Sequence, residues 1–261
     1  MRATHKMPLT PTSTRAVFIA GTDTDIGKTV VTAAILSILR AQGVDAVPMK
    51  PVQTGCFTRK GIIIAPDLEC CLSASGLNPD IDELDQMAPY RFRPACSPHL
   101  AARLDNRSIS PDTILKRFSA LQAKHDFVVI ECAGGILVPI GSRRTMLDII
   151  RQLGAPVILV ARPGLGTINH SLLSLQALRN AGVRVIGVLF NNATSARAGR
   201  IEKDNLRTVA GYGDVRILGS LPFARNMCRL QRSPAEFLKW AKSHLNLPVS
   251  ELLQSNSEMR P

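Results

Sequence analysis

The sequence predicts an α/β fold in which a single doubly wound, mostly parallel sheet carries helices on both faces. Short, continuous apolar runs recur along the chain and alternate with helix-like stretches, as in proteins built on a buried parallel sheet. A Gly-Lys-Thr tripeptide follows the first apolar run and opens the first helix-like stretch, where such sheets bind ligands. The chain of 261 residues is long enough for one large domain with a sizeable core.

The apolar runs have the length and composition of buried strands. They are residues 16–20 (AVFIA), 44–50 (VDAVPMK), 126–131 (DFVVIE), 156–161 (PVILVA), 184–190 (RVIGVLF) and a weaker candidate at 216–222 (RILGSLP). Helix-like stretches separate them at 27–42, 111–123, 145–153, 168–181 and 200–210. The first of these stretches ends before Gly43, because glycine is a natural helix C-cap.

One domain is expected over residues 16–246. Residues 1–15 are predicted to be a disordered leader, although their basic, acid-free and Ser/Thr-rich composition also resembles an organelle transit peptide. Segment 56–110 is less regular and is expected to form loops and short helices over the active face. An amphipathic stretch covers 235–245, and we expect residues 247–261 to form a flexible tail.

The chain is strongly basic, with 32 Lys and Arg against 20 Asp and Glu and a net charge of +12. Such a charge suits nucleic acid, an anionic membrane or anionic small ligands, and many basic proteins use it for none of these. The basic residues are scattered, although 184–232 is rich in arginine. No apolar run approaches the length of about 18 residues needed for a membrane-spanning helix. We expect neither a nucleic-acid nor a membrane partner.

The six cysteines show no CxxC pair and no regular spacing, and Cys70 and Cys71 are adjacent. This pattern argues against a disulfide framework or a zinc site and is typical of reduced cysteines in a cytosolic protein. The sequence therefore predicts a cytoplasmic location.

The stretch GTDTDIGKT, residues 21–29, resembles a phosphate-binding loop whose first glycine comes one position early. Main-chain N–H groups at the start of the following helix would face an anion, Lys28 would reach the β- and γ-phosphates, and the Thr29 hydroxyl would hold magnesium. The alternative is a chance tripeptide. Asp23 and Asp25 add two carboxylates to the loop, and for Asp23 a turn-forming role is the simpler interpretation.

Lys50 ends the second predicted strand and is followed by the turn PVQTG, so it faces the phosphate loop across the sheet edge. A second cation there would stabilise charge that develops during phosphoryl transfer. An exposed lysine at a strand end is the alternative. Thr54 and Gly55 follow in a tight loop that would present a hydroxyl and backbone amides at the same place.

Glu131 ends the run DFVVIE and precedes the glycines of CAGG, which resembles the Walker-B arrangement of a strand followed by an acid. Such an acid binds magnesium directly or through water. Asp67, in APDLECC, has the position of a helix N-cap by spacing alone.

Asn191 and Asn192 close a predicted strand, where side-chain amides offer both a donor and an acceptor to an adenine edge. Residues 222–224 would be the matching loop, and a plain Asn-Asn turn is the alternative. A helix is expected to start near 166–169, where free N–H groups would bind a carboxylate.

Six motifs occur in one order along the chain: GTDTDIGKT, KPVQTG (50–55), SPHLAA (97–102), ECAGG (131–135), LGTINH (165–170) and LPFARN (221–226). In this combination the chain resembles the dethiobiotin synthetase family over about residues 16–226. The resemblance implies a P-loop NTPase-like fold with a variant loop that has its glycine one residue early. It also implies an ATP- and Mg²⁺-dependent cyclo-ligase of biotin biosynthesis, in which 7,8-diaminononanoate takes up carbon dioxide as a carbamate, ATP phosphorylates the carbamate, and the second amine closes the ureido ring.

The resemblance assigns roles to residues by position in these motifs. Lys50, Lys28 and Thr24 are implied to be catalytic, and Thr29, Asp67 and Glu131 to surround magnesium, which replaces the cap interpretation of Asp67. The implied ATP-binding residues are Asp25, Ile26, Gly27, Lys28, Thr29, Val30, Asp67, Glu131, Cys132, Ala133, Gly134, Asn191, Asn192, Pro222, Phe223 and Ala224. The implied substrate-binding residues are Thr24, Thr54, Gly166, Thr167, Ile168 and Asn169, of which the last four would come from the partner in a homodimer.

Two positions depart from the family pattern. Asp25 is one methylene shorter than the glutamate that is common there, which weakens its role as a ligand. Cys132 replaces a common glycine and places a thiol beside Glu131, and we expect no catalytic role for it. The basic charge, the leader and the tail are not explained by the resemblance.

Two other functions are possible alternatives for a chain with this type of loop: an amide synthase and a partitioning-type ATPase. A corrinoid amide synthase would need a glutamine-hydrolysing domain, for which the chain is too short. A partitioning-type ATPase that binds DNA or membrane would explain the charge of +12, but its KGGxGKT loop carries a lysine where this sequence has Asp23.

Overall fold

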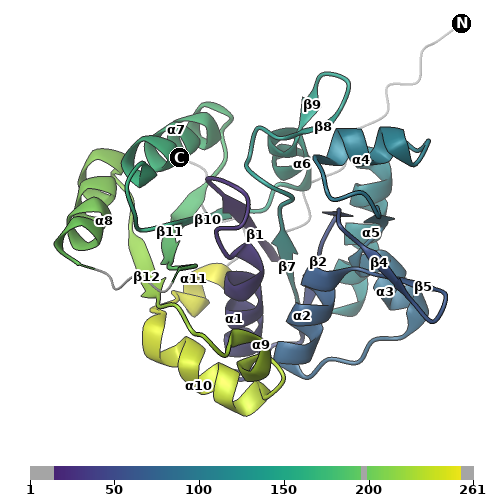
Figure 1. Cartoon of the computed structure of the whole chain (residues 1–261), viewed down its shortest axis with the longest axis horizontal. Helices are drawn as coiled ribbons and strands as arrows, with labels where there is room; N and C mark the ends of the chain where they lie inside the picture. The colour runs from purple at the N-terminus through teal and green to yellow at the C-terminus, as the bar shows by residue number, and fades with distance from the viewer. Residues whose placement is uncertain (1–14, 195–198, 254–261) are drawn as a thin grey trace, which may run out of the picture.

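The computed structural model describes residues 15–194 and 199–253. Its centre is a six-stranded, wholly parallel sheet with the strand order β12-β11-β10-β1-β7-β2 (Figure 1). The strands are β1 (Ala16–Gly21), β2 (Ala46–Met49), β7 (Phe127–Glu131), β10 (Val157–Ala161), β11 (Val185–Asn191) and β12 (Ile217–Leu221). All six predicted strands are therefore present, with ends that differ by one or two residues.

Residues along the central strand β1 alternate between two hydrophobic cores. Phe18 belongs to one core and Val17 and Ile19 belong to the other, because successive side chains of a strand point to opposite faces. Every residue of β1 is buried. Burial on both faces explains why the strands read as continuous apolar runs.

Helices cover both faces of the sheet, which confirms the predicted fold class. Helices α5 (Pro111–Lys124), α6 (Met146–Leu153) and α7 (Thr167–Asn180) contribute to the core on one face. Helices α1 (Lys28–Arg40) and α10 (Pro234–His244) contribute to the core on the other. Helix α8 (Arg200–Gly213) packs against α7, beside β11 and β12 (Figure 1).

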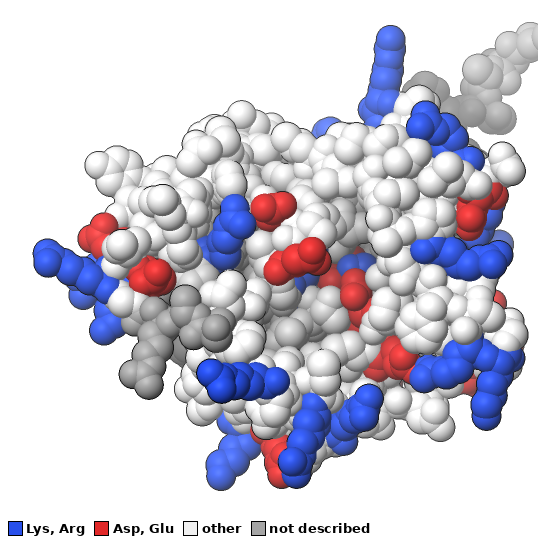
Figure 2. Space-filling model, in the orientation of Figure 1, with Lys and Arg blue, Asp and Glu red and all other residues white. Residues whose placement is uncertain are grey.

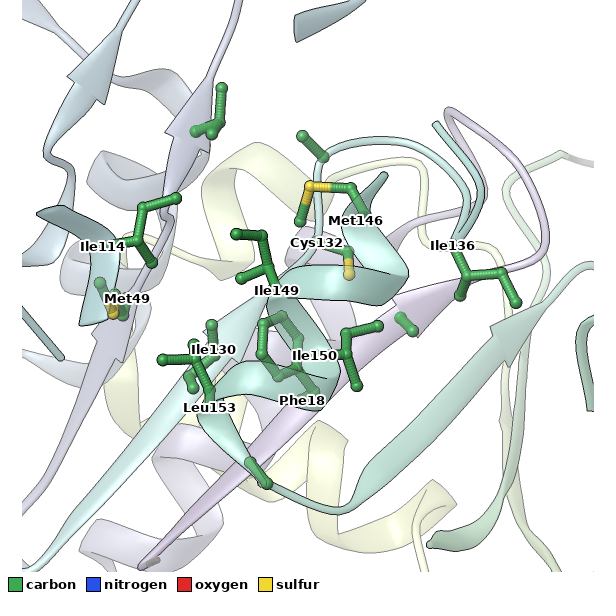
Figure 3. Packing of buried hydrophobic residues seen from close by; sticks show 14 of the residues in the cluster. Phe18, Met49, Ile114, Ile130, Cys132, Ile136, Met146, Ile149, Ile150 and Leu153 are labelled. Carbon is green, nitrogen blue, oxygen red and sulfur yellow. The ribbon is translucent and has the colours of Figure 1, made fainter. Parts of the chain in front are cut away.

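Helix α6 shows how the first core is closed. Its residues Met146, Ile149, Ile150 and Leu153 follow the i, i+3, i+4, i+7 pattern and are all buried. Figure 3 shows these side chains lying over Phe18 of β1 and over Ile130 and Cys132 at the end of β7. The contact fixes the position of the strand that ends in Glu131.

The segment 56–110 contains the short helices and loops that were predicted, and also short strands that were not. Its elements are β4 (Phe57–Arg59), β5 (Ile62–Ile64), α2 (Pro66–Ser75), α3 (Ile81–Met87), β6 (Tyr90–Arg91) and α4 (Pro98–Leu104). Strand β6 pairs with β3 (Val52–Gln53), and a further hairpin joins β8 (Pro139–Gly141) to β9 (Arg144–Thr145).

The chain beyond the sheet differs from the predicted flexible tail. After α9 (Met227–Leu230) and α10, residues Val249–Leu253 form α11, and Leu252 is buried in the second core. Glu251 pairs with Arg184 and Arg216, which lie just before β11 and β12. Apolar burial and these two ion pairs hold α11 on the domain. Residues 254–261 and the leader residues 1–14 lie outside the described residues.

None of the helices in the part of the chain that the structure describes has the length and apolar character needed to cross a bilayer.

Candidate active site

A cavity of about 820 Å³ opens at the carboxyl ends of the parallel strands. Figure 2 shows a hollow near the middle of the viewed face, with acidic side chains at its rim, while most Lys and Arg side chains stand around the periphery. The cavity is lined by Thr24, Asp25, Gly27, Lys28, Thr29, Val30, Lys50, Val52, Gln53, Thr54, Pro66, Asp67, Ala95, Cys96, Ser97, Pro98, Glu131, Ala133, Gly134, Val138, Asn191, Asn192, Ala193, Pro222, Phe223, Ala224 and Met227.

Two glycines shape the loop between β1 and α1. Gly27 precedes α1 with a φ of 86°, in the left-handed region that favours glycine. A Cβ at Gly27 would lie 2.1 Å from Nδ2 of Asn191. A Cβ at Gly21 would lie 2.8 Å from Cδ of Lys28 and 3.0 Å from the carbonyl oxygen of Asp23. The early glycine of the loop is therefore explained by the close packing of the Lys28 side chain against β1.

The ammonium group of Lys28 folds back over the loop. Its Nζ donates to the carbonyl oxygen of Asp23 at 2.7 Å, and the residue is buried. Burial lowers the pKa of Lys28, and the neighbouring charge of Lys50 lowers it further. A lysine with this position at a helix N-terminus can exchange its carbonyl partner for the oxygens of a bound phosphate.

A cluster of charged side chains, with Lys50 and Glu131 buried and Asp67 half-buried, lies at the carboxyl ends of β2 and β7. Nζ of Lys50 is 2.6 Å from Oε1 of Glu131 and 2.8 Å from Oδ2 of Asp67. It also donates to the carbonyl oxygen of Cys132 at 3.2 Å. The hydroxyl of Thr29 donates to the same oxygen of Glu131 at 2.9 Å. The fold thus brings together four residues that come from α1, α2 and the ends of β2 and β7.

The ion pairs shift the pKa values of this cluster. Burial alone lowers the pKa of Lys50, but the charges of Glu131 and Asp67 outweigh it and raise that pKa above its usual value. Burial likewise raises the pKa of Asp67, and the Lys50 charge outweighs it, so the pKa is lowered. Lys50 is therefore an ammonium and Asp67 a carboxylate at neutral pH.

The cluster fits a Mg²⁺ ion, although it contains only two carboxylates, Asp67 and Glu131. No group of three or more His, Cys, Asp or Glu side chains that could hold a metal occurs within 15–194 and 199–253. Mg²⁺ is usually held by one or two carboxylates together with substrate phosphates. Asp67 and Glu131 already converge on one cation, the Lys50 ammonium, and Thr29 adds a hydroxyl oxygen. These oxygen donors have the chemistry that Mg²⁺ requires.

The two asparagines at the end of β11 have different surroundings. Nδ2 of Asn191 donates to the carbonyl oxygen of Ile26 at 3.0 Å, so this side chain supports the phosphate loop. Oδ1 of Asn192 accepts from the backbone N–H of Thr194 at 3.1 Å, which is the turn considered as an alternative. Both residues still line the cavity, and 222–224 lie beside them because β11 and β12 are neighbouring strands and the N–H of Asn192 donates to the carbonyl oxygen of Leu221 at 2.9 Å.

Six residues of the predicted site do not line this cavity. Ile26 and Cys132 are buried in the two cores, and burial raises the pKa of Cys132 to about 12. Gly166, Thr167, Ile168 and Asn169 lie at the start of α7, outside the lining residues. The Thr167 side chain is buried and lies 3.4 Å from the hydroxyl of Ser171.

Other lining residues were not assigned a role from the sequence. They are Val52, Gln53, Pro66, Ala95, Cys96, Ser97, Pro98, Val138, Ala193 and Met227. Some of them belong to the motifs KPVQTG and SPHLAA, and these motifs were the sequence feature from which a place in the site could have been predicted. The others lie in loops or at the starts of α2 and α9, and their approach to the sheet edge leaves no mark in the sequence.

The chain is similar to a large set of known proteins. A family model described as an AAA domain matches residues 15–229. The chain is 37% identical over 213 residues to the ATP-dependent dethiobiotin synthetase BioD of Thermodesulfovibrio yellowstonii, covering 79% of this chain and 88% of the relative. It is 42% identical over 177 residues to the protein of the same name from Anaeromyxobacter sp. (strain K), covering 68% of this chain and 76% of the relative.

Solved structures support the fold. The cell division ATPase MinD of Pyrococcus furiosus superposes with a TM-score of 0.56 at 16% identity, covering 92% of this chain and 99% of MinD. The MinD protein of Pyrococcus horikoshii, in complex with Mg-ADP, gives 0.56 at 15% identity and covers 92% of this chain and 98% of that one. At this level of identity the likeness concerns the P-loop ATPase fold alone.

Proposed function

The chain belongs to the ATP-dependent dethiobiotin synthetase family, and from this premise we propose how its cavity performs the family's reaction. The enzyme is a ligase that converts 7,8-diaminononanoate, carbon dioxide and ATP to dethiobiotin, ADP and phosphate. One amine of the diamine takes up carbon dioxide as a carbamate, and a carbamate oxygen attacks the γ-phosphorus of ATP. The second amine then attacks the carbonyl carbon of the carbamoyl phosphate, phosphate leaves, and the ureido ring closes.

The observation that carries this proposal is the pair of buried lysines, Lys28 and Lys50, at one end of the cavity. Lys28 and the N-terminus of α1 bind the β- and γ-phosphates. Lys50 exchanges one of its three protein acceptors for the carbamate oxygen, holds it close to the γ-phosphate and stabilises the charge on the transferring phosphoryl group. Because its partners Glu131 and Asp67 keep it charged, this lysine is already positioned before substrates bind.

The remaining roles follow from position in the cavity. Thr29, Asp67 and Glu131 hold Mg²⁺, which neutralises phosphate charge when it is bound. Thr24 and Thr54 line the same cavity as Lys50 and bind the diamine and its carbamate. Asn191, Asn192 and the loop 222–224 line the cavity next to the phosphate loop, and we assign the adenine ring to them.

A homodimer would complete the substrate site. Residues Gly166 to Asn169 lie outside the cavity of their own chain, and the adjacent Leu165 is 90% exposed. A second copy of the chain packed over this loop would bury the Leu165 side chain. A partner's α7 N-terminus would then bind the carboxylate of the diamine.

Mixed oligomers test this arrangement. Lys50→Ala and Asn169→Ala are each expected to lower activity as homodimers. If the sites are shared, mixing the two inactive proteins after mild dissociation restores about a quarter of the wild-type rate, since a random mixture gives half heterodimers with one intact site each. A monomer by light scattering, or no recovery on mixing, contradicts the proposal.

We further propose a cytoplasmic location, which the six free cysteines support.

The reaction itself is tested by mixing the protein with ATP, Mg²⁺, bicarbonate and 7,8-diaminononanoate and following dethiobiotin and phosphate together. Omission of each component in turn should stop both products. The basic charge leaves a DNA- or membrane-binding ATPase as the rival. A rate of phosphate release that does not depend on the diamine but increases when DNA is added would favour that rival.

A further inference from the structure

The phosphate loop carries a carboxylate that the proposed reaction does not use. Asp23 lies between Gly21 and Lys28, in the loop that surrounds the phosphates of ATP. A negative charge in this position repels a polyphosphate unless a cation compensates it. The arrangement therefore needs a compensating group.

Arg162, the residue after the neighbouring strand β10, supplies that group. An amino group of its guanidinium, Nη2, lies 3.6 Å from Oδ2 of Asp23, and about half of each side chain is exposed. Figure 1 shows β1 and β10 side by side, and their parallel register pairs Gly21 with Val160. The same register, continued by two residues, places Asp23 opposite Arg162.

Backbone contacts keep both residues in place. The N–H of Thr22 donates to the carbonyl oxygen of Val160 at 3.0 Å and extends the β1–β10 pairing into the loop. On the other side, Nδ2 of the buried Asn205 donates to the carbonyl oxygen of Pro163 at 2.9 Å. Arg162 thus projects from a turn that is held at both ends.

Asp23 in turn organises the loop. Its Oδ1 accepts from the backbone N–H of Thr24 at 2.7 Å, and its carbonyl oxygen accepts from Nζ of Lys28 at 2.7 Å. A shift of Asp23 would therefore move both the residue that lines the substrate side and the lysine that reaches the phosphates.

We propose that Arg162 is a positioning residue that neutralises Asp23 and holds the phosphate loop in the form that binds ATP. The proposal rests on ATP being the substrate, as proposed above. Arg162 acts through Asp23, and its charge offsets the repulsion between the Asp23 carboxylate and the γ-phosphate.

The test is a charge-exchange series in which ATP affinity is measured by calorimetry without the diamine, and KM and kcat are measured with it. Arg162→Ala is expected to raise the Kd and KM for ATP about two- to fivefold at low salt, as for a half-exposed ion pair, with a smaller change in kcat. The effect should shrink in 0.5 M salt, where the Debye length is about 4 Å. Arg151→Ala, which removes an exposed arginine from α6, is the matched control and should behave as wild type.

The double variant Arg162→Ala with Asp23→Asn separates charge from structure. Asparagine keeps an oxygen acceptor for the Thr24 N–H but removes the negative charge, so the double variant should recover most of the ATP affinity that Arg162→Ala loses. Arg162→Lys should retain part of it.

Two results would overturn the proposal: wild-type ATP affinity in Arg162→Ala, or a double variant that binds ATP no better than the single one. A wild-type protein that binds ATP but makes no dethiobiotin would count against the proposed function instead. The calorimetric comparison of the variants would still test Arg162 in that case.

Discussion

Lys50 and Glu131 form a buried ion pair, with Nζ 2.6 Å from Oε1, although 81 residues separate them in the sequence. Removal of the lysine leaves Glu131 buried with only the Thr29 hydroxyl as a side-chain partner among the described residues. We therefore expect Lys50→Ala to lower stability by about 3 kcal/mol, as for other buried pairs that lose one partner. Turnover should fall at least about 10²-fold, while ATP binding through Lys28 and the loop is largely retained.

Urea unfolding, calorimetric ATP binding and product formation measure these three effects on one preparation. Arg216→Ala is a suitable control, because Arg216 pairs with Glu251 at the surface and its loss should cost no more than about 1 kcal/mol. Turnover near the wild-type rate in the Lys50→Ala protein would exclude the role assigned to Lys50.

Gly27 is the position in the phosphate loop where a side chain is least tolerated. Gly27→Ala places a methyl group 2.1 Å from Nδ2 of Asn191 and forces alanine to adopt a φ of 86°. The strain is about 1–3 kcal/mol, and relief of it would displace Asn191 from Ile26. We expect the Kd for ATP to rise about tenfold or more.

Gly164→Ala is the matched control for this substitution, since a Cβ at Gly164 meets nothing within 4 Å and its φ is not positive. It should bind ATP as the wild type does. Equal ATP affinity in Gly27→Ala and Gly164→Ala would mean that the loop is not constrained as described.

The strands and the phosphate loop could be predicted from the sequence because their signals are local. A strand buried on both faces must be apolar throughout, and a loop that embraces phosphates needs glycine at fixed positions. Placement of Lys50 and Glu131 at the same sheet edge also followed, since parallel strands share their carboxyl edge. The convergence of both residues with Asp67 within hydrogen-bonding distance is a detail that only the structure gives.

Other contacts left no signal in the sequence. The pairing of Asp23 with Arg162 depends on the register of β1 against β10, which no short pattern encodes. Helix α11 is short and lies in the stretch predicted to be a flexible tail, yet Leu252 and Glu251 attach it to the domain. In both cases the decisive partner is distant in sequence, so tertiary contacts override the local pattern.

The cysteines should differ strongly in reactivity. Cys228 is exposed, whereas Cys56, Cys71 and Cys132 are buried. Burial raises the pKa of Cys132 to about 12, so its thiolate is scarce at neutral pH. Ellman's reagent at pH 8 is expected to modify Cys228 first and Cys132 only after unfolding in guanidinium.

Mass spectrometry of the labelled peptides identifies the order of modification, and Cys228→Ser should remove the fast phase. Rapid labelling of Cys132 in the folded protein would show that the core over β7 opens more readily than its packing suggests.

The start of α8 provides a pH-dependent contribution to stability. Oε2 of Glu202 accepts from the backbone N–H of Gly199 at 2.6 Å, and this hydrogen bond lowers the pKa of Glu202. A depressed pKa stabilises the folded state above the unfolded value of about 4.3, and the contribution is lost as the pH falls through the folded-state value. Glu202→Gln should therefore be less stable than wild type at pH 7, and the difference should shrink as the pH falls below the unfolded value toward the lower folded-state pKa. Urea midpoints between pH 7 and pH 3.5 measure this difference in stability.

Glu236→Gln, in the first turn of α10, controls for the loss of a surface charge. A difference that persists unchanged at the lowest pH would mean that the shape of the side chain, and not the carboxylate charge, stabilises the helix.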